Sequence, residues 1–316
     1  MQLKPTRWHK TLFLLPAGAL LLFLLFISGC EKSVKVSFTT RDIIRFLIRD
    51  NPGIFSNSFL DTSRAAVAGT DFSFSRNFTI TSPDTAITLN DLDTVDQGGV
   101  STVVPRAPRD AGAEILDTLV GQFRIDSAGS PRPAKSFKLP VFKFGYFQKL
   151  DNDSKPNRGW FVMGATQTFV GVVRLIDTVH LHVTNPNNLS GYPKDLLAVR
   201  QDRNTNLDPL DDPQVVKVRT SPFQLKPNDS VEVRVRVRNT LDTLLHVFCH
   251  IGDLNAKRRI QLTERVPGEF FGGFKVSPEV YYDYRRLVVD AFTNNTLANP
   301  STFQNEIWGI IYQVYP

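Results

Sequence analysis

The sequence predicts a mainly β protein in which an N-terminal α+β domain, helices followed by an antiparallel sheet, precedes a C-terminal β-sandwich. Two observations predict this order. Apolar residues repeat at helical spacing near residues 41–50, whereas from Phe72 onward segments rich in β-branched and aromatic residues alternate with turn residues. In the second half these segments recur at regular intervals without a long helix, which is typical of a sandwich.

The composition indicates a core stabilised by packing. The chain has 316 residues, of which 41% are hydrophobic and 24 are phenylalanine. It has only two cysteines, Cys30 and Cys249, so no disulfide framework supports the fold. The length suffices for two ordinary domains.

The N-terminus has the layout of a bacterial export signal. Lys4, Arg7 and Lys10 precede an apolar run over residues 11–27, and no acidic residue stands before Glu31. A transmembrane helix needs about 20 apolar residues, so this run is short for one. We expect residues 1–29 to be a signal peptide, with an uncleaved membrane anchor or ordinary secretory cleavage as alternatives.

The end of the apolar run, Ile27-Ser28-Gly29-Cys30, resembles the lipobox of bacterial lipoproteins. The resemblance implies cleavage before Cys30 and attachment of lipid to its thiol, so that Cys30 anchors the protein in the cell envelope. Glu31, rather than Asp, at the sorting position favours the outer membrane. The protein then faces the periplasm or the cell surface, and the membrane is its first partner.

Removal of the signal changes the charge balance. Residues 1–29 contain three of the 37 basic residues and none of the 31 acidic ones, so the net charge falls from +6 to +3. No dense basic cluster follows, and export argues against nucleic acid as a partner. Residues 30–38 are polar and are expected to form a tether.

The first domain is expected over residues 39–168 and begins with a helix. Ile43, Ile44 and Leu47 repeat at helical spacing, and Pro52 is expected to stop the helix. A second short helix is predicted over Ser58–Ala68.

Strands follow these helices in the first domain. They are expected within residues 72–80, 115–125, 137–150 and 158–165. The segment Ser82–Ala113 carries Pro, Gly and Asp and is predicted to be rich in loops.

The order of these elements, with Gly159-Trp160 opening the last strand, resembles the cone-shaped fold of the nuclear-transport-factor-2-like superfamily. The resemblance covers Thr39–Thr166. It implies a cone-shaped domain in which enzymes place carboxylates or a His–Asp pair. Residues 30–179 contain no histidine, which argues against acid–base catalysis in this half.

The second domain is expected over residues 169–316. Its predicted strands lie within 169–175, 179–185, 214–220, 230–239, 244–252, 258–264, 269–276, 285–293 and 307–315. The segments "FQLKPNDSVEVRVRV" and "VVDAFTNN…IWGIIYQV" resemble immunoglobulin-like extracytoplasmic modules, without the cysteine pair of antibody domains. The resemblance implies an immunoglobulin-like β-sandwich and leaves the function open.

Two strand-like segments of this domain predict which side chains face the core. In residues 231–238 valines alternate with Glu232 and three arginines, which indicates a solvent face, with an anionic lipid or glycan surface as the alternative. Cys249 is in phase with Val247 and Ile251, so we expect a buried free thiol.

Two candidate metal sites are present. His180 and His182 share one face of a predicted strand, as do His246 and His250 of another, so four imidazoles converge on Zn²⁺ or Cu²⁺ only if the strands are adjacent. Alternatively, these histidines decorate outer faces. Oxygen ligands alternate in residues 202–208, as in an EF-hand calcium loop, but the glycine of the turn and the closing glutamate are missing.

No Gly-rich phosphate loop, Gly-x-Ser-x-Gly elbow or His-Glu-x-x-His motif occurs, so no catalytic residue and no cofactor are expected. The sequence therefore predicts a non-enzymatic binding or scaffolding lipoprotein of the cell envelope, with an envelope protein or a glycan as partner. The alternative is a small-molecule-binding, or hydrolytic, protein that uses a pocket in the first domain.

Overall fold

We describe the protein from a computed structural model, in which residues 39–316 form one compact unit. The structure describes residues 38–56, 62–97, 100–128, 130–171, 173–187, 189–199, 215–216, 222–238, 244–252, 257–277 and 284–315. Within these ranges no helix is both long and apolar enough to cross a membrane. Cys30 and the predicted signal peptide lie outside the described residues.

Most of the described residues lie in strands. The helical elements are α2 (Thr40–Asp50), α3 (Pro52–Phe55), the 3-10 helix η1 (Pro156–Gly159) and α4 (Asn294–Ala298). The strands are β1 (Ala65–Ala66), β2 (Phe72–Gln97), β3 (Val100–Ser127), β4 (Ser130–Pro131), β5 (Lys135–Lys149), β6 (Trp160–Thr166), β7 (Thr168–Val170), β8 (Ile176–Thr184), β9 (Lys194–Val199), β10 (Val215–Val216), β11 (Gln224–Leu225), β12 (Ser230–Val237), β13 (Leu245–Gly252), β14 (Lys257–Gln261), β15 (Thr263–Val266), β16 (Glu269–Lys275), β17 (Tyr284–Thr293) and β18 (Asn305–Val314).

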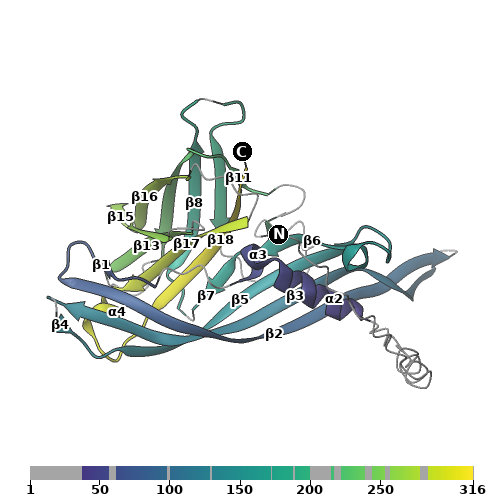
Figure 1. Ribbon diagram of the computed structural model, residues 1–316, viewed down its shortest axis with the longest axis horizontal. Coiled ribbons are helices and arrows are strands. Elements are labelled where there is room, and N and C mark those ends of the chain that lie inside the picture. The colour runs from purple at the N-terminus through teal and green to yellow at the C-terminus, as the bar shows by residue number, and fades with distance from the viewer. Residues whose placement is uncertain are drawn as a thin grey trace, which may run out of the picture. The chain divides into compact units, whose positions relative to one another are not determined.

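These strands form two sheets (Figure 1). The larger sheet has 13 strands in the order β1-β2-β3-β5-β7-β18-β17-β13-β14, with β4 beside β3, β6 beside β5, β10 beside β6 and β11 beside β18. The smaller sheet has five strands in the order β15-β16-β12-β8-β9. Neighbours pair antiparallel, apart from the parallel pair β11–β18. The predicted mainly β class is therefore confirmed.

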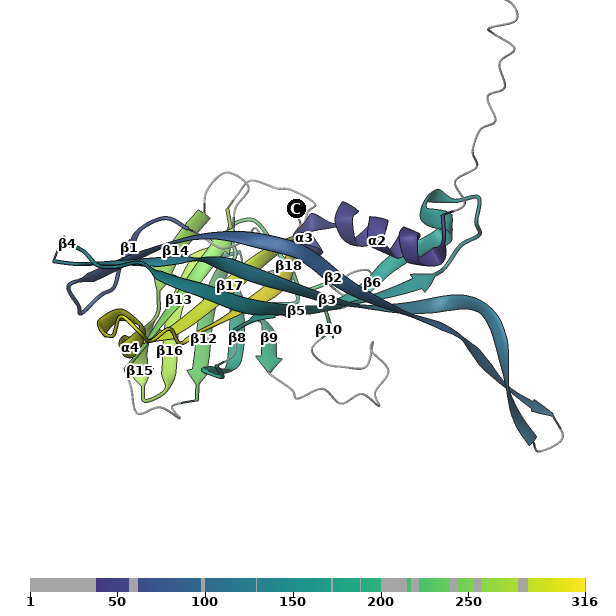
Figure 2. The same cartoon turned by 90° about the horizontal axis from the view of Figure 1, so that it is seen from below.

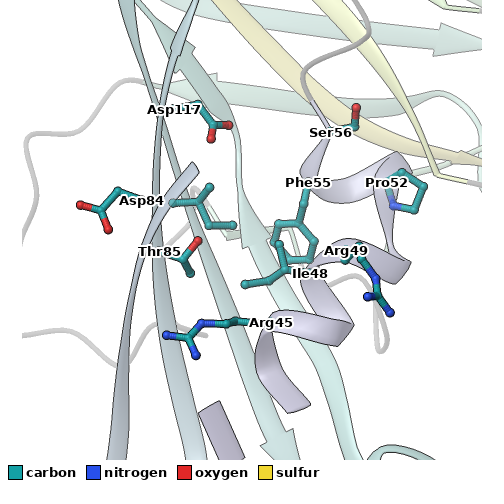
Figure 3. Close-up of a pocket in the computed structure, with 10 residues that line it drawn as sticks. Arg45, Ile48, Arg49, Pro52, Phe55, Ser56, Asp84, Thr85 and Asp117 are labelled. Atoms are coloured by element: carbon teal, nitrogen blue, oxygen red, sulfur yellow. The ribbon is translucent and has the colours of Figure 1, made fainter. Parts of the chain in front are cut away.

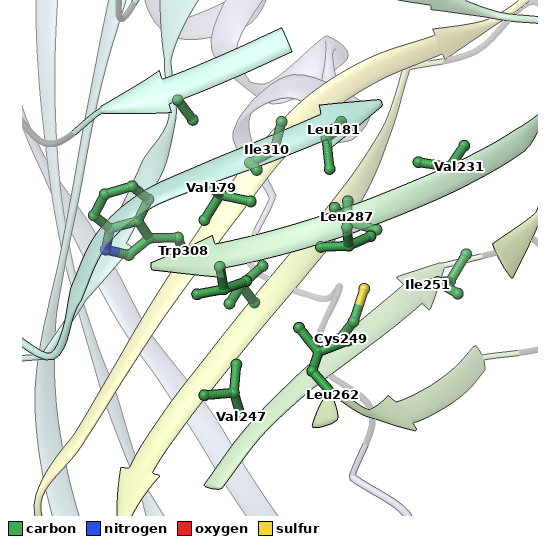
Figure 4. Packing of buried hydrophobic residues seen from close by; sticks show 14 of the residues in the cluster. Val179, Leu181, Val231, Val247, Cys249, Ile251, Leu262, Leu287, Trp308 and Ile310 are labelled. Atoms are coloured by element: carbon green, nitrogen blue, oxygen red, sulfur yellow. The ribbon is translucent and has the colours of Figure 1, made fainter. Parts of the chain in front are cut away.

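One core lies between the smaller sheet and β13, β17 and β18 of the larger one (Figure 4). In β12 the four valines face this core and the arginines face solvent, as predicted, because side chains alternate along a strand. Cys249 points into the same core and is 1% exposed, so the predicted buried thiol is confirmed. Burial raises the pKa of this thiol.

The larger sheet curls so that its first strands face its last ones. Side chains of β2, β3 and β5 pack against side chains of β13, β17 and β18 in a second core that is rich in phenylalanine, including Phe74, Phe123 and Phe292. Phe74 and Phe292 meet edge to face at 5.0 Å between ring centroids. This interior is filled by aromatic side chains.

The predicted first helix is confirmed as α2. Thr39 caps it, since its hydroxyl accepts from the Asp42 amide while the Asp42 carboxylate accepts from the Thr39 amide. Ile44 and Leu47 are buried in a third core on the inner face of the curled sheet. The helix ends at Asp50, before Pro52, as predicted. Pro52 then begins the separate short helix α3, where its missing N–H costs nothing.

The prediction that Ser82–Ala113 is rich in loops is wrong. β2 and β3 pair through this segment as one long hairpin, up to Gln97 and Val100 (Figure 2). Ile87 and Leu89 alternate toward the third core, so strand periodicity prevails over the Pro, Gly and Asp content. Two β-bulges absorb the irregular positions of the hairpin.

The second helix predicted over Ser58–Ala68 is also wrong where that range is described. Ala65 and Ala66 form β1, and Ala65 lies opposite Phe74 at the edge of β2. Unpaired backbone groups at a sheet edge favour such pairing, which here outweighs the helix propensity of alanine. Residues 58–61 of this prediction lie outside the described residues.

Strand β7 joins the two predicted domains into one sheet. Val170 of β7 pairs with Val141 of β5 on one side and with Ile307 of β18 on the other. The boundary expected between residues 168 and 169 thus lies within a strand that is hydrogen-bonded in both directions.

Candidate functional site

A cleft of about 660 Å³ opens between α2–α3 and the β2–β3 hairpin (Figure 3). Ligand pockets typically measure about 300–1,000 Å³. The residues that line the cleft are Arg45, Ile48, Arg49, Pro52, Phe55, Ser56, Asp84, Thr85, Ile115 and Asp117. The sequence patterns assign none of them to a site, because the helices and the hairpin that form the two walls are distant in the chain.

Local periodicity places these side chains. Arg45, Ile48 and Arg49 share one face of α2, since residues three and four apart are neighbours on a helix. Ile115 and Asp117 share one face of β3, since side chains repeat every two residues in a strand. The cleft is thus built from regular secondary structure on both sides.

A glycine in β5 brings α3 close to the sheet. A Cβ atom at Gly145 would lie 2.9 Å from a ring carbon of Phe55, closer than real Cβ contacts. The Phe55 ring therefore packs directly on the backbone of β5 and stacks on Phe147 at 6.0 Å. This approach fixes the apolar wall of the cleft.

Polar groups lie at both ends of that wall. Figure 3 shows Asp117 and Ser56 at one end, Arg45 at the other, and Phe55 and Ile48 between them. The arrangement offers an apolar surface flanked by charged and hydroxyl groups, which is suited to recognising an amphipathic molecule.

A buried ion pair underlies the inner end. Lys143 Nζ lies 3.2 Å from Asp117 Oδ2 and also donates to the Phe55 carbonyl. Burial and the nearby Arg286 charge lower the pKa of Lys143 to about 8, although Asp117 opposes the shift. Burial likewise lowers the pKa of Arg286 to about 9. Two buried cations, Lys143 and Arg286, therefore lie behind the Asp117 carboxylate that lines the cleft.

A second buried charge cluster lies in the phenylalanine-rich core. The Arg76 guanidinium makes two hydrogen bonds to the Asp290 carboxylate, at 2.6 and 3.0 Å, and Asn305 Nδ2 donates to it at 2.6 Å. His250 Nε2 lies 3.2 Å from the same carboxylate. Burial would raise the pKa of Asp290, but the Arg76 charge and the contacts with His250 and Arg76 hold it well below its usual value. The cluster is fully enclosed, which indicates a structural role.

The four candidate histidines are not brought together. His180 and His182 lie on β8 of the smaller sheet, where both contact Asp195 at 2.9 Å on the exposed face. His246 and His250 lie on β13 of the larger sheet and are buried. The core between the two sheets separates the pairs. Among the described residues no group of three or more His, Cys, Asp or Glu side chains is placed to hold a metal ion.

The EF-hand-like segment, with Asp202, Asn204, Asn206 and Asp208 as candidate ligands or as part of a solvated loop, lies outside the described residues. The arginine stripe is described and faces solvent. Its member Arg234 pairs with Glu269 on β16 at 2.5 Å, which gives the stripe a partner within the sheet.

Comparison with known proteins identifies no relative. No protein family, no curated protein and no solved structure gives a significant match to this chain. The geometry of the cleft and the N-terminal sequence are therefore the basis of the functional proposal.

Proposed function

We propose that the chain is a lipid-anchored extracytoplasmic binding protein without enzymatic activity. The sequence supports this through the order of positive charges, apolar run and lipobox that ends at Cys30. Glu31 favours the outer membrane as its location. An envelope protein or a glycan, predicted from the sequence as partner, would meet the exposed face of the smaller sheet.

The observation that carries the binding function is the cleft between α2–α3 and the β2–β3 hairpin. It combines an apolar wall with ionisable groups at both ends, in a volume typical of small-molecule sites. The segment from Cys30 to Thr40 spans at most about 35 Å when fully extended. An anchor at Cys30 would therefore keep α2, and with it the cleft, near the membrane.

We further propose that the second half is an immunoglobulin-like sandwich. Its support is the spatial order β8-β12-β16-β15 in one sheet and β13-β17-β18 in the other, which corresponds to strands A-B-E-D and C-F-G of that fold. For the first half, α2 and α3 on the inner face of a curved antiparallel sheet support the cone-shaped resemblance.

Replacing Thr85 by tryptophan is expected to fill the cleft and abolish ligand retention. The full-length protein, purified from bacterial membranes and incubated with an extract of cell envelopes, should carry a small molecule in native mass spectrometry. Thr85 lines the cleft, so an indole there should reduce the bound fraction about tenfold or more.

The control is tryptophan at Ala86, the next residue, which is exposed on the opposite face of β2. This variant should retain the ligand. Equal retention by both variants, or no bound molecule in the wild type, would contradict the proposed site.

A further inference from the structure

We propose that the cleft binds an amphipathic anion, with its apolar chain against Ile48, Phe55 and Ile115 and its acidic head group on Arg45. This inference rests on the proposed function, since it names the ligand class of the same cleft. It follows from the distribution of apolar, positive and negative groups around the cleft.

Arg45 is available to receive an acidic head group. Its side chain is 56% exposed and pairs with Asp42 at 3.3 Å across one turn of α2. Exposed pairs of this kind contribute little to stability, so an incoming anion competes with Asp42 at little cost. A guanidinium binds carboxylate or phosphate through two parallel hydrogen bonds.

A second hydrogen-bond donor borders the same place. Figure 3 shows Arg45 extending from α2 toward the strand that carries Thr85, whose hydroxyl is a further hydrogen-bond donor. Arg49 lies one turn further along α2, is 69% exposed and pairs with Asp50 at 3.0 Å. Figure 3 shows the Arg49 side chain on the other side of the helix from Arg45, so Arg45 is the cation that meets the head group.

The carboxylates of the lining are poorly placed to repel an anion. The Asp84 carboxylate points away from the helices in Figure 3. Asp117 is paired with Lys143, and the buried Arg286 adds a second positive charge behind it. The field inside the cleft therefore favours negative charge over positive charge.

The apolar wall of the cleft determines the part of the ligand beyond its head group. Ile48, Phe55 and Ile115 offer apolar surface next to Arg45, and each methylene buried there is worth about a threefold to fourfold gain in affinity. An aliphatic or aromatic chain that carries a single carboxylate or phosphate combines both requirements.

Photolabelling with matched head groups tests this inference. The full-length protein in lipid nanodiscs is exposed to octanoate carrying a diazirine at the far end of the chain, and to the corresponding alcohol and amine. We expect the carboxylate to label residues 40–56 about tenfold or more above the alcohol and the amine, because charge-assisted hydrogen bonds form only with the anion.

Two variants make the test specific. Arg45→Gln should reduce labelling by the carboxylate to the level of the alcohol. Arg41→Gln, an exposed arginine one turn earlier in α2 that is not part of the lining, should leave it unchanged. Both positions are exposed, so circular dichroism should show the same fold in each variant.

The outcomes separate this inference from the proposed function. Equal labelling of the cleft by all three probes would overturn the anion preference and leave the cleft as a ligand site. Labelling of the cleft by none of them would overturn both. Labelling by the carboxylate that persists in Arg45→Gln would overturn the role of Arg45 as head-group residue.

Discussion

Replacing Asp290 by asparagine is expected to lower the free energy of unfolding by about 3–5 kcal/mol at neutral pH. The variant keeps the shape of the side chain but leaves the Arg76 guanidinium buried without its counter-ion. Both side chains are at most 2% exposed, so water cannot solvate the Arg76 charge once the Asp290 charge is removed. Urea denaturation monitored by circular dichroism measures the difference.

The destabilisation caused by Asp290→Asn should depend on pH. Because the folded-state pKa of Asp290 lies well below its usual value, its contribution is present above about pH 4 and is lost as the pH falls toward the folded-state pKa. The difference in free energy of unfolding between wild type and variant should therefore be constant between about pH 5 and 7 and shrink below about pH 4.

Asp84→Asn, at an exposed position, is the control and should change the free energy of unfolding by less than about 0.5 kcal/mol. A loss below about 1 kcal/mol for Asp290→Asn would contradict the structural role.

Replacing Lys143 by methionine is expected to destabilise the protein by about 3–5 kcal/mol at pH 7, because the Asp117 carboxylate then stays buried without the Lys143 charge. The double variant Lys143→Met/Asp117→Leu should recover most of this loss, since apolar side chains of similar size often replace a buried ion pair without cost. The free energies of unfolding of the two variants, measured by urea denaturation, decide the point.

The Lys143–Asp117 pair also predicts how the stability of the protein changes at alkaline pH. The folded-state pKa of Lys143 is about 8, below its ordinary value of 10.5, so the unfolded chain holds the proton more tightly between these values. The stability of the wild type should therefore rise from about pH 8 to pH 10.5, and this rise should be weaker in the double variant. Equal stability of the single and double variants at pH 7 would contradict the prediction, because it would show that Asp117 does not destabilise the protein when Lys143 is absent.

Strong local periodicity made some elements predictable from the sequence. The valine–arginine alternation of β12 and the apolar spacing of α2 each identify both the element and its buried face. Cys249 is placed correctly for the same reason. Each of these features depends only on residues within one helix or one strand.

The long hairpin was predictable in principle but was obscured by its composition. Gly98-Gly99 between two alternating segments is a signal for a two-residue hairpin loop. Pro83, Pro105 and Pro108 in the same stretch favour a loop interpretation, whereas the structure accommodates the irregular positions at bulges. One wall of the cleft was therefore missed together with the hairpin.

The buried charges and the joined sheet depend on contacts between distant segments. Arg76 is in phase with Phe74 in β2, which marks an inward charge, but nothing local identifies Asp290 as its partner. The pairing of β7 with both β5 and β18 likewise arises from long-range strand order. Local patterns hold no information on such pairings, so the cleft and the charge cluster emerge only from the three-dimensional structure.

Intact mass of the full-length protein purified from membranes of a lipoprotein-competent bacterium tests the central claim, anchoring through Cys30, most directly. We expect a mature chain that begins at Cys30 and carries additional acyl mass. The Cys30→Ala variant should lack this mass and should no longer fractionate with the membranes. An unmodified chain in the wild type, or the same mass shift in the variant, would contradict a lipid-anchored binding protein.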